Sequence, residues 1–330
     1  MAETLLSIED LKTYFYTKSG VVKAVDGVSF SIEKGKTLGV VGESGSGKSI
    51  TAMSILQLIQ SPPGRIVSGR IMFDGVNLLE LSPKEIRKIR GNEISMIFQD
   101  TMTSLNPVLT VGEQLSEVIM LHRKLDKKDA QAKTVEMLGL VGLPDPGKRV
   151  KSYPHELSGG MRQKVMIAMA LSCNPKLLIA DEPTTALDVT MQAQILELMN
   201  DLKEKLNTSI MMITHDLGII AGICDYVVIM YAGKLVEYAG IEDVFKSPQH
   251  PYTLGLLASL PKIEEEHSES RLKAIEGFPP DPRNMPFGCS FAPRCRKAVE
   301  RCFREQPVSR EFNERHLVSC HLVASKLNRG

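Results

Sequence analysis

The sequence contains no tryptophan, few aromatic residues of any kind (5%) and no long run of lysine and arginine. Its formal net charge is only +1 over 330 residues. The charge therefore gives no indication of a surface that grips nucleic acid or an anionic bilayer, and we expect no nucleic-acid partner. Hydrophobic residues at 43% suffice for a globular core, and the length suits one large and one small domain.

Long apolar runs are also absent. The most apolar stretch, LGIIAGICDYVVIMYAG at 217–233, is interrupted by Asp225 and by glycines. It falls short of the roughly 18 to 20 uninterrupted apolar residues of a spanning helix, so we interpret it as a short helix followed by a buried strand. The first residues, MAETLLSIEDLK, do not have the pattern of a secretory signal. We expect a cytoplasmic chain that reaches a membrane only through another chain.

A glycine-rich loop, GESGSGKS at 42–49, lies between a strand-like run, TLGVV at 37–41, and a helical pattern at 49–58. The glycines let backbone N–H groups turn inward around phosphate oxygens, and the helix N-terminus adds partial positive charge. We expect Lys48 to reach the β- and γ-phosphates and the Ser49 hydroxyl to complete Mg²⁺ coordination. The predicted ATP-binding residues of this loop are Gly42, Glu43, Ser44, Gly45, Ser46, Gly47, Lys48, Ser49 and Ile50.

A second apolar run, KLLIADE at 176–182, ends in two carboxylates. We expect Asp181 to hold Mg²⁺ through water, and Glu182 to orient or polarise the water that attacks the γ-phosphate. The same residues would suit a helix cap after a strand. The phosphate loop upstream favours the catalytic interpretation.

Between these motifs lies LSGGM at 157–161. Ser158 and the N–H groups of Gly159 and Gly160 open a helical pattern and so form a second anion-binding terminus. This order of motifs resembles that of ATP-binding cassette (ABC) ATPases, although Met161 replaces the commoner glutamine. The resemblance implies that the Ser-Gly-Gly terminus of one subunit closes on ATP bound to a second ATPase subunit.

The same resemblance assigns roles to three other residues. It implies that Gln99, at the end of NEISMIFQ, contacts the metal and the attacking water. It also implies that Asp188 communicates between the two nucleotide sites of a dimer and that His215 touches the γ-phosphate. A histidine after a strand is often only structural, but here it follows four other motifs in the family's order.

Three consecutive aromatic residues lie near the N-terminus, in LKTYFYT. The family pattern implies that one of them stacks on the adenine ring, and its alignment with LKTYF favours Phe15 over Tyr14 and Tyr16. The alternative is that these side chains only pack on the faces of a strand.

The resemblance implies an α/β fold, an ABC-type P-loop nucleotide-binding domain over residues 1–245. This domain is expected to combine a mostly parallel sheet, an antiparallel β subdomain and a helical subdomain at about 99–174. Residues 246–330 are expected to form a small cysteine-rich C-terminal extension. It contains a charged linker, EEEHSESRLK at 264–273, and a proline-rich segment, GFPPDPRNMPFG at 277–288.

Two stretches, DTMTSLNPVLTVGEQL at 100–115 and FKSPQHPYTLGLLASLP at 245–261, resemble the ATPase subunits of bacterial dipeptide and oligopeptide importers. This resemblance implies an ATP-hydrolysing subunit at the cytoplasmic face of the membrane. Its implied partners are a homologous ATPase subunit in a heterodimer, two membrane permeases and, indirectly, an extracytoplasmic peptide-binding protein. The alternatives are import of nickel or another small solute, a soluble ABC protein acting on ribosomes or DNA, and a regulatory subunit with weak turnover.

The C-terminal part contains four of the six cysteines, Cys289, Cys295, Cys302 and Cys320. Two structural disulfides are not expected in a cytosolic chain, so metal binding is the natural alternative. The spacing lacks a Cys-x-x-Cys pair, which weakens a zinc-ribbon interpretation. The pattern resembles tails of peptide-importer ATPases that hold a [4Fe–4S] cluster, with Zn²⁺ and free thiols as alternatives.

Overall fold

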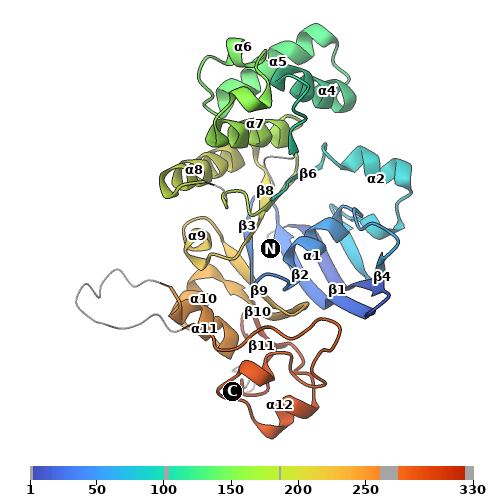
Figure 1. Ribbon diagram of the computed structural model, residues 1–330, viewed down its shortest axis with the longest axis vertical. Coiled ribbons are helices and arrows are strands. Elements are labelled where there is room, and N and C mark those ends of the chain that lie inside the picture. Colours follow the sequence, from blue (N-terminus) through green and yellow to red (C-terminus); the bar gives the residue numbers. More distant parts are fainter. Residues whose placement is uncertain (1–2, 100–103, 186, 261–273, 324–330) are drawn as a thin grey trace, which may run out of the picture. The chain divides into compact units, whose positions relative to one another are not determined.

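The structure is a computed structural model that describes residues 3–99, 104–185, 187–260 and 274–323 (Figure 1). It divides into two compact units that each gather distant parts of the sequence. The helical unit comprises 1–3, 33–36 and 80–212, and the β-rich unit comprises 4–32, 37–79 and 213–330. The predicted charged linker at 264–273 and the start of the 100–115 stretch lie outside the described residues.

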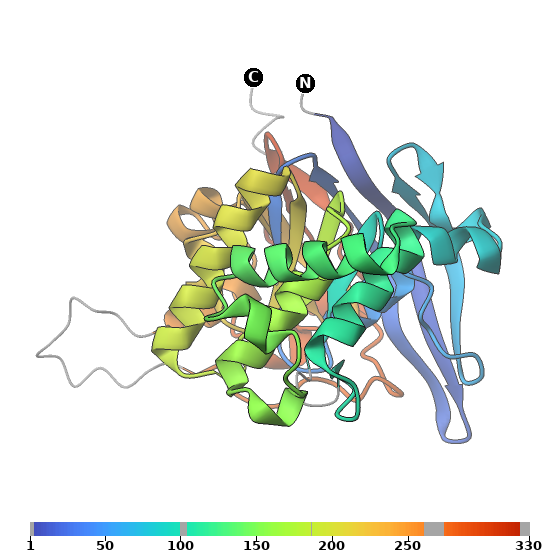
Figure 2. The same ribbon diagram turned by 90° about the horizontal axis from the view of Figure 1, so that it is seen from above.

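The helical unit is built around three helices, α4 (Val111–Arg123), α5 (Lys127–Leu140) and α7 (Gly159–Leu171), which contact one another (Figure 2). Their shared core contains the fully buried Leu115 and Leu138. Thr110 begins α4 with a capping box, because its side chain and that of Glu113 each satisfy the other's backbone N–H. The unit also contains α2 (Pro83–Ile89), α6 (Pro146–Arg149), α8 (Val189–Leu206) and the parallel pair β6 (Ile94–Ile97) and β7 (Leu177–Asp181).

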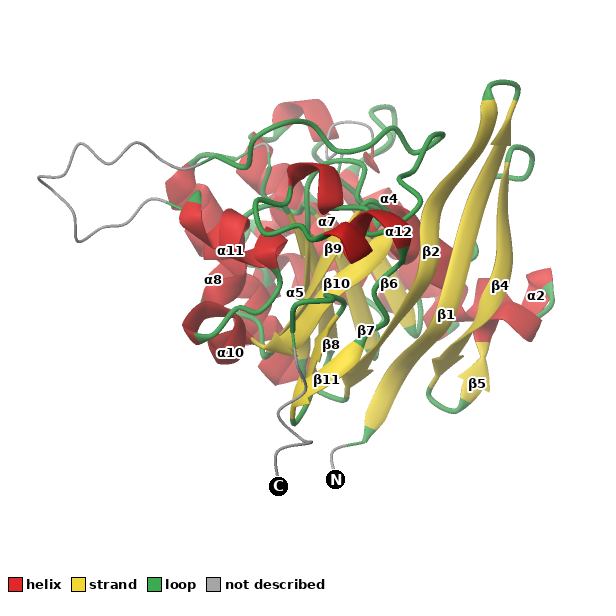
Figure 3. Ribbon diagram, turned by 90° about the horizontal axis from the view of Figure 1, so that it is seen from below, coloured by secondary structure: helices red, strands yellow, loops and turns green. Residues whose placement is uncertain are grey.

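The β-rich unit contains two groups of strands (Figure 3). One is a four-stranded sheet in the order β2-β1-β4-β5. In the other, β9 is parallel to β3 and antiparallel to β10, while β12 pairs antiparallel with both β10 and β11. The strands are β1 (Thr4–Thr17), β2 (Gly20–Glu33), β3 (Thr37–Val41), β4 (Gly64–Phe73), β5 (Val76–Asn77), β9 (Tyr226–Tyr231), β10 (Lys234–Gly240), β11 (Arg310–Asn313) and β12 (His316–Val318).

The observed fold is α/β, as predicted, and it contains both parallel and antiparallel strand pairs. The antiparallel strands come partly from the C-terminal extension, because β12 pairs along β10. A buried hydrogen bond of 2.7 Å between His316 Nε2 and Glu237 Oε1 joins the same two strands. The extension is therefore attached to the sheet by backbone pairing and by a buried polar contact.

Helices of the β-rich unit are short. They are α1 (Lys48–Ile55), α9 (Leu217–Ala221), α10 (Ile241–Lys246), α11 (Pro251–Ala258) and α12 (Glu300–Arg304). The strand β8 (Ser209–Thr214) has residues in both units. The apolar stretch at 217–233 forms the predicted short helix, α9, followed by the buried strand β9. Within the part of the chain that the structure describes, no helix is both long and apolar enough to cross a bilayer.

Candidate functional site

The glycine-rich loop lies where the sequence places it, between the fully buried strand β3 and the first residue of α1. Gly47 precedes that helix with φ at +101°, a region that L side chains rarely adopt. A Cβ at Gly47 would collide with the Ala24 carbonyl oxygen, and one at Gly42 with that of Met230. Glycine at these two positions lets the loop turn tightly against neighbouring backbone.

The side chain of Lys48 lies within this loop and is only 6% exposed. Its Nζ donates hydrogen bonds to the Gly42 carbonyl oxygen at 2.7 Å and to that of Glu43 at 3.0 Å. The Ser46 hydroxyl is also buried and has no hydrogen-bond partner among the described residues. The loop therefore presents a buried cation and a hydroxyl donor, which suits phosphate oxygens.

A pocket of about 390 Å³ opens beside the loop. Phe15 lines this pocket, whereas Tyr14 does not, because its hydroxyl donates to Asp26 Oδ1 at 2.6 Å. Tyr16 is 51% exposed. The other lining residues are Val22, Lys23, Ala24, Glu43, Ser44, Gly45, Ser46, Gly47, Ile50, Tyr231, Ala232, Gly233, Pro279, Pro280, Pro282 and Met285.

The pocket thus includes a wall from the proline-rich C-terminal segment, which no sequence pattern links to the phosphate loop. Its residues lie more than 220 positions beyond the phosphate loop along the chain. No local spacing pattern relates two such distant segments. Only the tertiary structure reveals that they share one pocket.

The acidic pair, Asp181 and Glu182, lies in the helical unit at the end of β7. Because β6 and β7 are parallel, their carboxyl ends meet at one edge and bring Gln99 close to Glu182. Gln99 Nε2 donates to Glu182 Oε2 at 2.9 Å, and the Thr185 hydroxyl donates to the same oxygen at 3.0 Å. Asp181 is buried, and Glu182 has a φ of +47°, an uncommon backbone conformation that is frequent at functional sites.

The Ser-Gly-Gly element begins α7, as the sequence predicts. Ser158 is the N-cap, and its hydroxyl oxygen accepts a hydrogen bond of 3.3 Å from the Met161 N–H. Asp188 caps α8 in the same way, accepting from the Met191 N–H at 2.9 Å. The two helix starts lie close together, since a Cβ at Gly160 would collide with the Met191 methyl group.

The remaining predicted residue, His215, directly follows β8 and is exposed. The described geometry therefore brings the predicted residues together in two groups. The β-rich unit contains the phosphate loop with Phe15, and the helical unit contains Gln99 with the acidic pair and, at its helix starts, Ser158 with Asp188.

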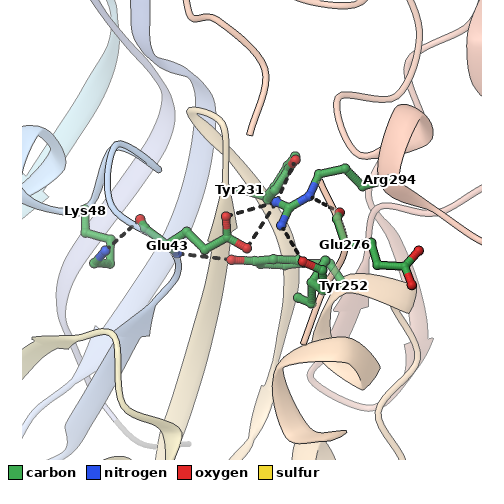
Figure 4. A network of polar contacts seen from close by, with 7 residues as sticks. Glu43, Lys48, Tyr231, Tyr252, Glu276 and Arg294 are labelled. Atoms are coloured by element: carbon green, nitrogen blue, oxygen red, sulfur yellow. Dashed lines mark hydrogen bonds and ion pairs between the residues drawn. The ribbon is translucent and has the colours of Figure 1, made fainter. Parts of the chain in front are cut away.

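A further group of polar side chains surrounds Glu43 and was not predicted from the sequence (Figure 4). The Glu43 carboxylate accepts hydrogen bonds from Arg294, and its backbone N–H donates to the Tyr252 hydroxyl oxygen at 3.0 Å. Tyr252 belongs to the His-Pro-Tyr sequence at 250–252, so one of these residues was visible as part of a motif. The Arg294 contact had no sequence signal.

The predicted metal site in the extension receives no support. Among the residues that the structure describes, no group of three or more His, Cys, Asp or Glu side chains is arranged to hold a metal ion, and none of the six cysteines forms a disulfide. Burial raises the pKa of Cys289, Cys295 and Cys320, and neighbouring thiols raise it further. A raised pKa favours the protonated thiol, which is the form that does not bind metals.

Two protein families match the sequence. The family described as "ABC transporter" matches residues 25–185, and the family described as "Oligopeptide/dipeptide transporter, C-terminal region" matches residues 236–302. The second match includes the His-Pro-Tyr sequence and Arg294. Both the phosphate loop and the residues that hold Glu43 therefore lie within matched regions.

Curated relatives match nearly the whole chain. The oligopeptide transport ATP-binding protein AppD of Bacillus subtilis is 55% identical over 97% of this chain and 97% of its own. The dipeptide transport ATP-binding protein DppD of the same organism is 51% identical over 97% and 95%. The oligopeptide transport ATP-binding protein OppD of Escherichia coli is 53% identical over 99% and 95%.

Solved structures match a smaller part of the chain. The ATP-binding cassette MJ0796, described as a dimeric post-hydrolysis state bound to ADP and Pi, has a TM-score of 0.64 and 25% identity. This match covers 72% of this chain and 98% of that chain. CbiO1 of Clostridium perfringens, described as part of the transporter complex cbiONQ, has a TM-score of 0.63 and 26% identity, over 77% and 95%.

Proposed function

Because the chain belongs to the family of ATP-binding subunits of oligopeptide and dipeptide ABC transporters, we propose that it powers uptake of short peptides through membrane permeases. The chain has the ABC ATPase fold and is an ATPase. The observation that carries the peptide assignment is the similarity over the full length, including the C-terminal region named for peptide transporters.

We propose that the phosphate loop binds the phosphates of ATP. The fit rests on the buried ammonium of Lys48 and the buried, unpartnered hydroxyl of Ser46, which both suit phosphate oxygens. Phe15 lines the adjoining pocket, where its ring is available to stack on adenine.

Mg²⁺ is expected with ATP in this family, and we assign its ligands to Ser49, Asp181 and Gln99. When bound, the ion neutralises charge on the phosphate oxygens. Oxygen-rich side chains of this kind are the ligands that Mg²⁺ prefers.

The proposed hydrolytic residues act on the attacking water. Glu182 orients that water, and the hydrogen bonds from Gln99 and Thr185 hold its carboxylate in place. We assign contact with the γ-phosphate to His215. The water oxygen bonds to the γ-phosphorus as the bond to the β,γ-bridging oxygen breaks, so that ADP leaves.

A second ATPase subunit is the first proposed partner. The helix start at Ser158, with its two glycines, supplies a positive dipole end suited to the γ-phosphate of an ATP held by that subunit. We assign communication between the two sites to Asp188, which lies beside this helix start. The related cassette MJ0796 is described as dimeric.

Membrane permeases are the second proposed partners. The helical unit has a pocket of about 600 Å³ lined by residues of α4 and α5, among them Ser116, Met120 and Val135. A groove with both apolar and polar lining suits an amphipathic helical segment. We propose that this groove receives the permease and so keeps the chain at the cytoplasmic face of the membrane. The proposed domains are the nucleotide-binding domain at 1–245, with its helical subdomain at about 99–174, and the C-terminal extension at 246–330.

The four C-terminal cysteines remain a proposed [4Fe–4S] site, with Zn²⁺ as the alternative. The proposal rests on the resemblance of their spacing to that of cluster-binding tails and on backbone N–H groups that donate to three of the sulfurs. Metal binding requires loss of the thiol protons. Anaerobic purification followed by iron, sulfide and zinc analysis tests this, and a folded, metal-free protein would contradict it.

Uptake by reconstituted vesicles tests the transport proposal. The chain, its partner ATPase and two permeases are placed in liposomes with an external peptide-binding protein, and entry of a labelled dipeptide is measured with internal ATP. We expect ATP-dependent uptake that the Glu182→Gln variant lacks. Uptake of nickel instead of peptide, or co-sedimentation of the chain with ribosomes or DNA and no uptake, would contradict the proposal.

A further inference from the structure

Glu43, the second residue of the phosphate loop, is held by two residues from the C-terminal part of the chain (Figure 4). Arg294 ends a short helical turn just before Cys295, and Tyr252 lies in the first turn of α11. Both are more than 200 positions from Glu43 along the chain. The contacts therefore join the phosphate loop to the C-terminal extension.

Arg294 is built into this place rather than resting on the surface. Its side chain is 7% exposed, and one terminal nitrogen donates to both Glu43 carboxylate oxygens, at 3.1 and 2.9 Å. The other guanidinium nitrogens donate to the carbonyl oxygens of Glu276, at 3.0 Å, and Ile275, at 3.3 Å. Because several partners fix a planar, permanently charged group, Arg294 has a defined position and cannot lose its charge.

Tyr252 holds the backbone of the same loop residue. Its hydroxyl oxygen accepts the Glu43 N–H, and its fully buried ring packs against Tyr231 and Phe291 with centroids 4.7 and 5.4 Å apart. Packing against one ring from β9 and one from the extension leaves the Tyr252 ring little freedom, so its hydroxyl holds the Glu43 backbone N–H in a defined position.

The negative charge of Glu43 explains why the contacts from Arg294 and Tyr252, together called the clamp, are needed. Glu43 lines the same pocket as the phosphate loop, and its side chain is 27% exposed. A carboxylate there would repel the anionic phosphates of ATP, most strongly where water is scarce. The Arg294 guanidinium offsets that charge, while the segment with Pro279, Pro280 and Met285 closes one side of the pocket.

We propose that Arg294 and Tyr252 are positioning residues for ATP binding, through which the C-terminal extension becomes part of the nucleotide site. Arg294 neutralises and orients the Glu43 side chain, and Tyr252 fixes the loop backbone. The inference rests on the proposed ATP site at 42–50. It predicts that damage to this clamp weakens ATP binding while leaving the hydrolytic residues intact.

The test measures ATP affinity by isothermal titration calorimetry on the full-length subunit, together with KM, kcat and Tm. Arg294→Met should weaken ATP binding on the order of tenfold, because it leaves Glu43 unpaired beside the phosphates. Arg294→Lys should restore part of the affinity. The matched control is Arg296→Met, which removes an exposed ion pair with Glu276 in the same segment and should leave ATP affinity unchanged.

Two further variants separate positioning from general stability. Glu43→Gln combined with Arg294→Met removes both charges and should recover ATP affinity to within about threefold of wild type. Tyr252→Phe keeps the ring but removes the acceptor, so KM for ATP should rise two- to fivefold with kcat little changed. These variants also serve if Arg294→Met alone does not fold.

Each outcome decides the inference. Wild-type ATP affinity in a folded Arg294→Met protein would overturn it, and so would a folded double variant that fails to recover affinity. A fall in kcat with unchanged KM would also overturn it, since that would place Arg294 in the chemical step. Failure of the wild-type chain to bind ATP would instead refute the proposed nucleotide site.

Discussion

The phosphate loop and the C-terminal extension both determine the position of Glu43, but they do so by different means. The loop acts through consecutive residues whose glycines allow a tight turn and whose lysine lies inside it. The extension acts through single side chains, Arg294 and Tyr252, that reach the loop only because β12 and the aromatic core attach the extension to the sheet. The comparison separates chemistry carried by a contiguous motif from positioning carried by tertiary contacts.

The largest expected effect is on turnover. Glu182→Gln should lower ATP hydrolysis by at least about 100-fold, because the amide cannot polarise the attacking water. ATP affinity should stay close to wild type, and the closed dimer should accumulate, as measured by calorimetry and size-exclusion chromatography. Turnover near the wild-type rate would show that Glu182 is not a catalytic residue.

A pair of glycine variants tests the geometry of the loop. Gly47→Ala should destabilise the protein by about 3 kcal/mol or more, because it adds both positive-φ strain and a collision with the Ala24 carbonyl oxygen. Gly45→Ala is the matched control, since its φ is also positive but nothing lies within 4 Å of the added Cβ. Its loss should be about 1 kcal/mol. Equal losses in chemical denaturation would show that the collision is relieved by movement of the loop.

The stability that the C-terminal extension contributes should depend on pH, whereas that of the phosphate loop should not. Complete burial lowers the pKa of His250 from 6.5 to about 4. The unfolded chain therefore takes up a proton at higher pH than the folded one, and the stability present above pH 6.5 is lost as the pH falls toward 4. The loss should reach about 3 kcal/mol at pH 4.

The measurement is the midpoint of urea unfolding between pH 7.5 and 4, followed by tyrosine fluorescence. His250→Asn retains a side-chain acceptor for the Tyr252 N–H but does not titrate in this range, so its stability should depend less on pH. Parallel curves for the two proteins would show that other groups govern acid unfolding. Glu237 contributes in the same direction, because hydrogen bonds from His316 and nearby backbone overcome the effect of burial and hold its pKa below the usual value.

Sequence patterns predicted the elements whose signals are local. The strand, loop and helix around residues 37–58, the helix that opens at Ser158, and the helix and strand at 217–233 all depend on periodicity and on glycine or capping residues within a few positions. The pairing of β12 beside β10 was not predicted, because it joins two segments far apart along the chain. The predicted metal centre found no support because cysteine spacing does not determine how sulfur atoms meet in space.

By itself, the sequence determined the phosphate loop, the acidic strand end and the Ser-Gly-Gly helix start, because each requires particular residue types at fixed short spacings. Only the tertiary structure showed that proline-rich residues form one wall of the pocket that Phe15 lines. It alone placed Arg294 against Glu43. The physical reason is that this partly buried ion pair depends on two distant segments packing together, and no periodicity along the chain records which segments will meet.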